Sequence, residues 1–272
     1  MTRLSVLQMA SGPDVAANLG VAGELLAQAQ GEGAVLALLP ENFAFMGRGE
    51  GDRRTVAEAD GAGPMQAFLA DTARRLKLWV IGGTIPLTSA AGDGRTTNTC
   101  LVYSAAGERV ARYDKIHLFD VDVPGKRERY HESASVAPGS DCVVVDTPVG
   151  VVGLSVCYDV RFPELYRRLV EQGAELLVVP SAFTTPTGRA HWETLLRARA
   201  IENLCYVAAA AQSGIHASGR ETYGDSMIVD YWGRVLGRLP RGRGAVTGNV
   251  DRDAQRAARA SFPSLTHRVL RT

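Results

Sequence analysis

Three ionisable side chains in this sequence each follow an apolar, strand-like run. Cys157 ends the run VVGLSVC, Glu41 follows LALLP, and Lys115 follows RVARYD. The carboxyl ends of strands in α/β sheets meet at one edge, where ligand sites collect, so a thiol, a carboxylate and an ammonium can converge there. Each residue alone has an ordinary explanation, as a buried thiol or a solvated surface charge. The combination of the three residues, rather than any one of them, therefore indicates nucleophilic chemistry.

Such a set can perform acyl transfer through a thioester. The strand-to-helix turn at Cys157 places backbone N–H groups near the thiol, which favours its thiolate form. Glu41 can remove a proton from Cys157 or from water and later protonate the leaving amine. Lys115, with the backbone N–H of Tyr158, can stabilise the oxyanion of the tetrahedral intermediate. A carboxylate beside an ammonium forms an inert salt bridge unless burial or a second charge tunes it.

The blocks that carry these residues resemble the carbon–nitrogen hydrolase (nitrilase) superfamily over nearly the whole chain. They are PENF at 40–43, YDKIHLF at 113–119, YHES at 130–133, GLSVCYDVRFPEL at 153–165, AHWETLLRARAIEN at 190–203 and YGDSMIVDYWG at 223–233. The resemblance implies a catalytic triad of Glu41, Lys115 and Cys157. It also implies that Glu132 is an additional acidic residue that orients Lys115. Glu128, in the charged run KRER, is the competing candidate for that role.

The resemblance further implies the fold and the reaction. Composition alone does not choose between a barrel and two sheets covered by helices, but the superfamily has a four-layer α-β-β-α sandwich, usually paired into homodimers. The implied activity is hydrolysis of a linear carboxamide without a cofactor or a metal. The blocks at 190–203 and 223–233 are more similar to Nit-type amidases that cleave deaminated glutathione, to an α-keto acid and a dipeptide, than to ω-amidases. An ω-amidase acting on α-ketoglutaramate-type acids and a non-catalytic interaction module on the same fold remain alternatives.

Two arginines are candidates for binding the carboxylates of such a substrate. Arg161 follows Cys157 by about one helical turn and can face the keto-acid end, while Arg220 in the 212–222 loop can reach the other end. A structural clamp between Arg161 and Asp159 or Glu164 is an equally open interpretation.

Length, charge and cysteine content narrow the class of protein. The 272 residues, 46% of them hydrophobic, are consistent with one domain over 1–272. The 30 basic and 29 acidic residues are balanced, so nucleic acid and anionic membranes are not expected partners. The four cysteines are scattered without a C-x-x-C pair or a metal-like spacing, and the first residues show no signal-like run. We therefore expect a cytoplasmic enzyme that acts on a small-molecule amide.

Strand-like and helix-like patterns alternate along the chain. Asp14 can cap a helix whose apolar residues follow the helical period, and Pro64 can begin another. Two more helices are expected over 163–172 and 190–203. Strands are expected over 3–10, 34–40, 78–85, 97–104, 108–114, 141–146, 151–157, 175–180, 205–212, 225–231 and 244–250.

Overall fold

Two six-stranded sheets form the centre of the computed structural model, which describes residues 1–122 and 129–270. The first sheet has the order β16 (Gly244–Val250), β1 (Thr2–Gln8), β2 (Leu36–Leu38), β3 (Trp79–Thr88), β4 (Thr96–Tyr103) and β5 (Arg109–Asp114). The second has the order β15 (Val235–Leu239), β14 (Ser226–Val229), β11 (Tyr206–Ala209), β10 (Leu176–Val178), β9 (Gly150–Leu154) and β8 (Val144–Thr147). In each sheet the inner strands are parallel and the outer strands pair antiparallel.

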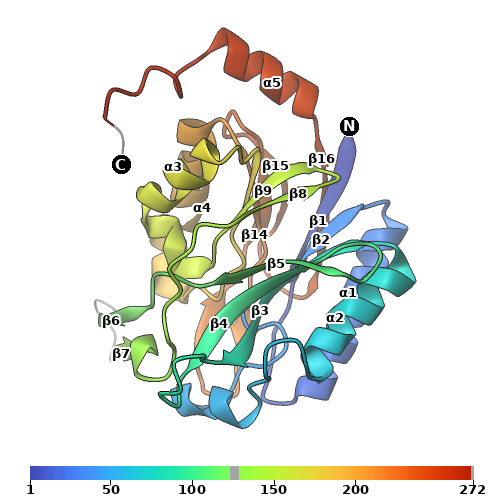
Figure 1. The fold of residues 1–272 in the computed structure, drawn as a ribbon, viewed down its shortest axis with the longest axis vertical. Coiled ribbons are helices and arrows are strands. Elements are labelled where there is room, and N and C mark those ends of the chain that lie inside the picture. Colours follow the sequence, from blue (N-terminus) through green and yellow to red (C-terminus); the bar gives the residue numbers. More distant parts are fainter. Residues whose placement is uncertain (123–128, 271–272) are drawn as a thin grey trace.

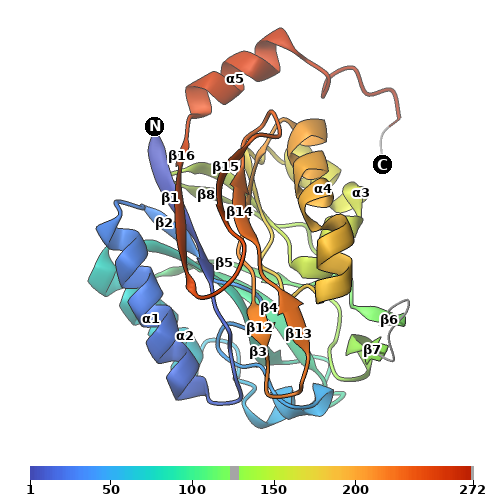
Figure 2. The same ribbon diagram turned by 180° about the vertical axis from the view of Figure 1, so that it is seen from behind.

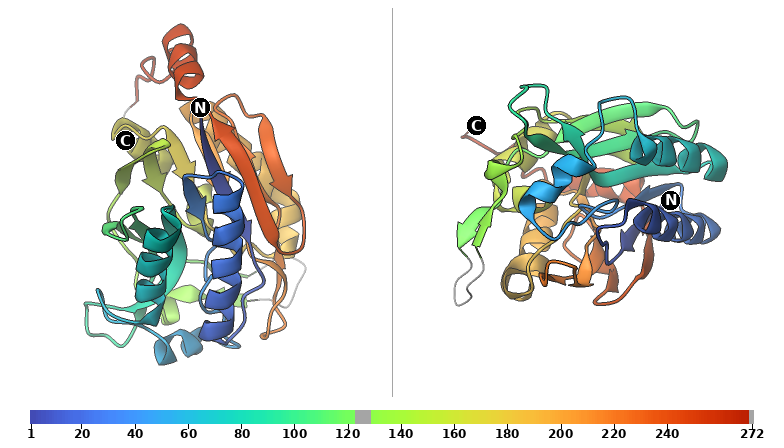
Figure 3. Two further views of the ribbon diagram at one scale, coloured as in Figure 1. Left: turned by 90° about the vertical axis from the view of Figure 1, so that its right-hand side faces the viewer. Right: turned by 90° about the horizontal axis from the view of Figure 1, so that it is seen from below.

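Helices cover the outer face of each sheet (Figures 1 and 2). The first sheet carries α1 (Val15–Gly31) and α2 (Pro64–Leu76), which lie side by side in the left view of Figure 3. The second sheet carries α3 (Pro163–Glu171) and α4 (Thr185–Asn203), while α5 (Arg252–Ser261) extends from the end of the molecule. The layers therefore follow the order α-β-β-α, as predicted.

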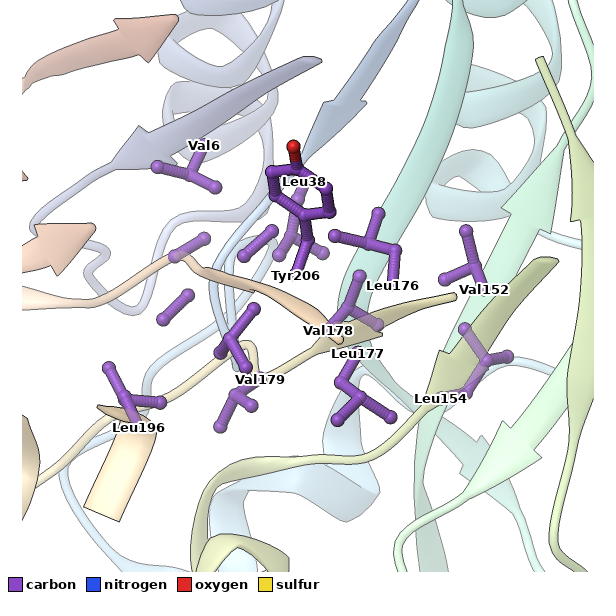
Figure 4. Close-up of a cluster of buried hydrophobic side chains, with 14 of the residues drawn as sticks. Val6, Leu38, Val152, Leu154, Leu176, Leu177, Val178, Val179, Leu196 and Tyr206 are labelled. Carbon is purple, nitrogen blue, oxygen red and sulfur yellow. The ribbon is translucent and has the colours of Figure 1, made fainter. Parts of the chain in front are cut away.

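Apolar side chains from both sheets fill the space between them. In Figure 4, Val6 and Leu38 from the first sheet face Val152, Leu176 and Tyr206 from the second. A second cluster, which includes Leu26 and Leu69, packs α1 and α2 against the first sheet. The burial of this apolar surface fixes the two sheets against each other, so the strand ends of both sheets are rigid supports for a site.

The expected elements are present, with ends that shift by a few residues. Asp14 caps α1 by accepting a hydrogen bond from the Ala17 N–H at 3.0 Å, and Pro64 begins α2. All eleven expected strands occur, whereas the helix expected over 190–203 already begins at Thr185. The pattern did not reveal α5, the edge strand β15, or two hairpins, β6 (Asp120–Asp122) with β7 (Arg129–His131) and β12 (Ser213–Ile215) with β13 (Glu221–Tyr223). These elements are short or largely exposed, and lack the apolar periodicity on which prediction depends.

No helix in the described ranges is long and apolar enough to cross a membrane.

Candidate active site

Glu41, Lys115, Cys157 and Glu132 converge at one end of the sandwich. Glu41 follows β2, Lys115 follows β5, and Cys157 follows β9 and begins the 3₁₀ turn η3 (Cys157–Arg161). Glu132 begins another such turn, η2 (Glu132–Ala134), after the β6–β7 hairpin. The structure thus brings together, from both sheets, the four side chains that the sequence singled out.

Cys157 occupies a strained backbone position. Its φ of 51° lies in the left-handed region, which a residue with a side chain rarely adopts. Two hydrogen bonds hold the turn: the Cys157 N–H donates to Pro180 O at 2.9 Å, and the Val156 N–H donates to the carboxylate of Asp159 at 2.8 Å. Tyr158 follows directly and lines the same cavity as the thiol. The turn therefore places Cys157 beyond the end of β9, in the wall of this cavity.

Glu41 is fixed from several directions. An added Cβ on Gly83 would lie 2.0 Å from Leu39 O, so only glycine allows β3 to approach the segment that carries Glu41 this closely. The carboxylate is 3% exposed; Oε2 accepts the Ala182 N–H at 2.9 Å and Oε1 accepts Lys115 Nζ at 3.0 Å. The backbone oxygen of Glu41 accepts from Gln212 at 3.0 Å. This carboxylate is preorganised, with Oε1 bound by Lys115 and Oε2 bound by the Ala182 N–H.

Lys115 lies between two carboxylates. Its side chain is 2% exposed, and Nζ is 2.8 Å from Glu132 Oε2 as well as 3.0 Å from Glu41 Oε1. Burial alone would lower the pKa of Lys115, but the charges of Glu132 and Glu41 raise it above the ordinary value, so the ammonium is retained. Burial alone would raise the pKa of Glu132, yet Lys115 and Arg53 outweigh it and lower the pKa to about 2. The two charges thus keep each other ionised, as the proposed second acid requires.

The thiol differs from the sequence-based expectation. Burial and the charge of Glu41 raise the pKa of Cys157 well above its ordinary value, although Lys115 and the Ala182 N–H oppose them. The expectation that the turn favours the thiolate is therefore wrong for the resting site. The physical reason is that desolvation disfavours a buried anion more than nearby dipoles stabilise it. Cys157 rests as a thiol, and a base must remove its proton when the substrate is attacked.

A cavity of about 890 Å³ contains these groups. Its wall includes Glu41, Lys115, Glu132, Cys157, Tyr158, Phe183 and four arginines: Arg48, Arg53, Arg129 and Arg220. The lining segments are the turn η1 (Glu50–Thr55) with the loop before it, β7 with η2, and the β12–β13 hairpin, which gather at the lower end of the molecule in Figures 1 and 2. Volume, concavity and ionisable groups together make this the candidate active site.

The family model of the carbon-nitrogen hydrolases matches residues 3–260 of the sequence. The chain belongs to this family. It is 44% identical to the deaminated glutathione amidase of Synechocystis sp. over 267 residues, which cover 97% of each chain. The NitFhit protein of C. elegans has a TM-score of 0.91 and 39% identity, and covers 98% of this chain, which spans 65% of that one. Saccharomyces cerevisiae Nit3, a member of branch 10 of the nitrilase superfamily, has a TM-score of 0.86 and 29% identity, over 96% of this chain and 94% of Nit3. The predicted superfamily and its sandwich fold are confirmed.

The two arginines predicted to bind substrate lie in different surroundings in this carbon–nitrogen hydrolase. Arg220 lines the cavity, and its guanidinium lies 4.9 Å from the centre of the Tyr130 ring. Arg161 is not among the residues that line the cavity: it lies over the rings of Tyr158 and Phe183 and contacts His191 at 3.3 Å. Arg161 thus packs behind two side chains of the wall. Glu128, the competitor of Glu132, lies outside the described residues.

Sequence reasoning missed Asn98 and Arg53. Asn98 is a buried amide in β4 that donates to both Glu41 and Glu132. The polar residue within TTNTCLVY was the available signal, because an amide in a fully buried strand must find partners. Arg53 lines the cavity on η1, where its charge acts on Glu132. No pattern in GEGDRRT distinguished Arg53 from an ordinary surface charge.

No group of three or more His, Cys, Asp or Glu side chains within 1–122 and 129–270 is arranged to hold a metal ion. The expectation of a hydrolase without metal or cofactor stays a prediction, which activity measured after exhaustive chelation would check.

We expect Glu132→Gln to flatten the dependence of stability on pH between about 4.3 and 2. The pKa of Glu132 is about 2 in the folded chain, below its ordinary value of about 4.3 in an unfolded one. In this window the unfolded state binds more protons, so wild-type stability falls as the pH falls. Glutamine does not titrate, and the variant therefore loses this part of the slope. Urea unfolding at several pH values measures it.

Asp253→Asn is the control, since Arg256 also lowers the pKa of Asp253 but that carboxylate is fully exposed. If the stability of Glu132→Gln depended on pH as steeply as that of the wild type, the lowered pKa assigned to Glu132 would be wrong. Turnover distinguishes Glu132 from its competitor Glu128. If Glu128→Gln lost nearly all activity while Glu132→Gln remained fully active, Glu128 would be the acidic residue that orients Lys115.

Proposed function

We propose that this chain hydrolyses a linear carboxamide through a Cys157 thioester, with deaminated glutathione as the substrate. One observation carries the mechanism: the Cys157 thiol lies against the Glu41 carboxylate, whose Oε1 is bound by Lys115. The relatives named deaminated glutathione amidase support the choice of substrate. The burial of this ionised set argues against a non-catalytic module, because such a module does not require the cost of desolvating three charges.

The first half-reaction forms the thioester. Glu41 takes the thiol proton as the sulfur of Cys157 attacks the amide carbon, and a C–S bond forms. The carbonyl oxygen becomes an oxyanion between Lys115 Nζ and the Tyr158 N–H, which are preorganised donors. When the intermediate collapses, the C–N bond breaks and Glu41 returns its proton to the departing amine. For deaminated glutathione, the amine that leaves is the dipeptide.

The second half-reaction releases the acid. Glu41, ionised again, removes a proton from a water molecule as the water oxygen attacks the thioester carbon. The same donors hold the second oxyanion. The C–S bond then breaks, the proton on Glu41 passes to the sulfur, and the α-keto acid leaves with Cys157 restored as a thiol. The high pKa of the thiol suits this cycle, because Glu41 takes the proton from sulfur when the thioester forms and returns one to sulfur when the thioester is hydrolysed.

The cavity wall is suited to an anionic substrate. Among residues 1–122 and 129–270, the wall carries four arginines and no carboxylate besides Glu41 and Glu132. The Nε of Arg220 is buried without a hydrogen-bond partner, and Arg53 faces the same cavity, where its charge acts on Glu132. Guanidinium groups bind carboxylates strongly when water is excluded. We therefore assign Arg220 to the distal carboxylate of the substrate and Arg53, in place of Arg161, to its keto-acid end.

We expect kcat/KM for deaminated glutathione to exceed that for α-ketoglutaramate at least tenfold, about 1.4 kcal/mol of differential transition-state binding. Only the longer substrate has a second carboxylate, on the leaving dipeptide, for Arg220 to bind. Arg220→Ala should therefore depress kcat/KM for deaminated glutathione alone, whereas Arg53→Ala should depress it for both substrates. Steady-state kinetics on the two substrates side by side measure these effects.

Arg256→Ala, on α5 and outside the cavity wall, is the control and should leave both rates unchanged. Equal or reversed specificity would move the assignment to an ω-amidase. If Arg161→Ala but not Arg53→Ala depressed both rates, the original assignment of the keto-acid end would stand.

We also propose that the enzyme is a homodimer. Ile201, Trp232 and Phe262 are each half exposed, and the rings of Trp232 and Phe262 are 5.8 Å apart. Exposed apolar side chains that adjoin one another are typical of protein interfaces. Light scattering of the purified protein measures its mass, and a monomer at micromolar concentration would refute the proposal.

The proposed location is the cytoplasm. All four cysteines are free thiols in the structure, and the nucleophile must stay reduced to act. Fractionation with an antibody against the chain would test this location.

A further inference from the structure

Asn98 completes a closed ring of hydrogen bonds around the catalytic carboxylates. Its side chain is 1% exposed, and Nδ2 donates to Glu41 Oε1 at 3.0 Å and to Glu132 Oε1 at 3.1 Å. Lys115 bridges the same two carboxylates from its own position, at 3.0 Å and 2.8 Å. Each carboxylate is therefore bound by one neutral and one charged side chain, in addition to a backbone N–H from Ala182 or Phe119. Asn98 is the neutral side-chain counterpart of Lys115.

The orientation of the amide follows from the charge of its neighbours. Asn98 Oδ1 is buried and has no hydrogen-bond partner, although a buried polar atom without a partner costs about 1–3 kcal/mol. The opposite orientation would place Oδ1 against two carboxylates, which is worse. The amide of Asn98 therefore leaves Oδ1 without a partner, while Nδ2 donates two hydrogen bonds. This arrangement is favourable only while Glu41 and Glu132 are both ionised.

The ring also determines which oxygen of Glu41 can accept a proton. An ionised carboxylate oxygen has two lone-pair sites, and Asn98 and Lys115 fill both sites of Oε1. Oε2 accepts the Ala182 N–H, and that same N–H contacts the thiol of Cys157. Oε2 is thus the oxygen that keeps a lone-pair site, and the Ala182 N–H that it shares with the thiol points to it as the oxygen on the side of the sulfur.

We propose that Asn98 is a positioning residue that holds the carboxylates of Glu41 and Glu132 in place and makes Glu41 Oε2 the atom that takes the Cys157 proton. The inference rests on the proposed role of Glu41 as the base. A neutral amide is suited to the task because it stabilises both anions without adding charge to a set that already has two carboxylates and one ammonium. An aspartate of the same shape would remove both donors and add a third carboxylate.

The rate at which iodoacetamide alkylates Cys157 tests the proposal without any amide substrate. Peptide-resolved mass spectrometry separates Cys157 from the half-buried Cys142 and the buried Cys100 and Cys205. The rate is measured from pH 5 to 10 for the wild type, Glu41→Gln, Asn98→Asp and Asn98→Ser. Serine keeps one donor at most, and so supplies an answer if the aspartate variant does not fold.

At pH 7 we expect Asn98→Ser to slow alkylation at least tenfold, with KM for substrate nearly unchanged and kcat reduced. Asn98→Asp should slow it further, and should move the pH profiles of alkylation and of kcat/KM at least one unit toward higher pH. The shift arises because a third carboxylate adds a negative charge that raises the pKa of the Cys157 thiol further, so the thiol loses its proton only in more alkaline solution.

Gln66→Glu is the matched control. Gln66 is also a buried amide that donates to a buried carboxylate, Glu58, at 3.0 Å, but it lies on α2 outside the cavity wall. The Gln66→Glu substitution should lower the melting temperature of the protein and leave the pH profiles of alkylation and of kcat/KM unchanged. If Glu41→Gln slows alkylation while both Asn98 variants keep the wild-type rate and profile, the role of Asn98 is refuted and the mechanism stands. If Glu41→Gln alkylates at the wild-type rate, the proposed base itself is wrong.

Discussion

Cys157→Ala is expected to abolish turnover of every amide substrate and to leave the fold intact. The thioester needs a sulfur that can attack the carbonyl carbon, and alanine provides no nucleophile. The side chain is small and sits at the wall of the cavity, so its loss leaves no large void in the core. The acyl-enzyme should also disappear, which intact-protein mass spectrometry during turnover can detect as a missing mass increment.

Cys142→Ala is the matched control, because Cys142 is a free, half-buried thiol outside the cavity wall. It should retain wild-type kcat and the acyl-enzyme. Cys100→Ala and Cys205→Ala should also retain the chemistry, although each removes a buried thiol and should lower stability by roughly 1 kcal/mol or more. Residual activity of Cys157→Ala near the wild-type rate would exclude the thioester mechanism.

The strand-end positions of Glu41, Lys115 and Cys157 could be predicted from the sequence because local patterns determine them. Each follows an apolar run whose burial is required by the core, and a strand that ends must release its next side chain at the sheet edge. The pairing of two sheets face to face was not a local property, and it came from the resemblance. The extent of one domain over 1–272 stays a prediction.

Other features of the site depend on contacts that no local pattern contains. Arg161 follows Cys157 by four residues, but stacking on Tyr158 and Phe183 keeps it out of the cavity wall. The pKa of Cys157 depends on burial from both sheets, which the turn alone does not reveal. Asn98 gains its role from Glu41 and Glu132, which come from distant parts of the chain. Sequence spacing therefore located the charged groups but not the environment that tunes them.

Glu41→Gln is expected to lower kcat by a factor of about 10² to 10⁴, the usual contribution of a positioned base. The amide has nearly the shape of the carboxylate and can still bind Lys115, but it cannot accept the thiol proton. Because the pKa of Cys157 is raised, very little thiolate forms without this base at neutral pH. The loss should shrink as the pH rises, since hydroxide then ionises the thiol directly. Single-turnover acylation measured from pH 6 to 10 follows both effects.

The control is Glu58→Gln, which changes another buried carboxylate. Glu58 accepts from the Met65 and Gln66 N–H groups at the start of α2, and it lies outside the cavity wall. Its replacement should reduce the melting temperature and leave kcat and its pH dependence unchanged. If Glu41→Gln lost activity by the same factor at every pH, Glu41 would serve only to hold Lys115 and the Ala182 N–H. The proton would then need another acceptor, and Glu132, bound to the other side of Lys115, would be the next carboxylate to test.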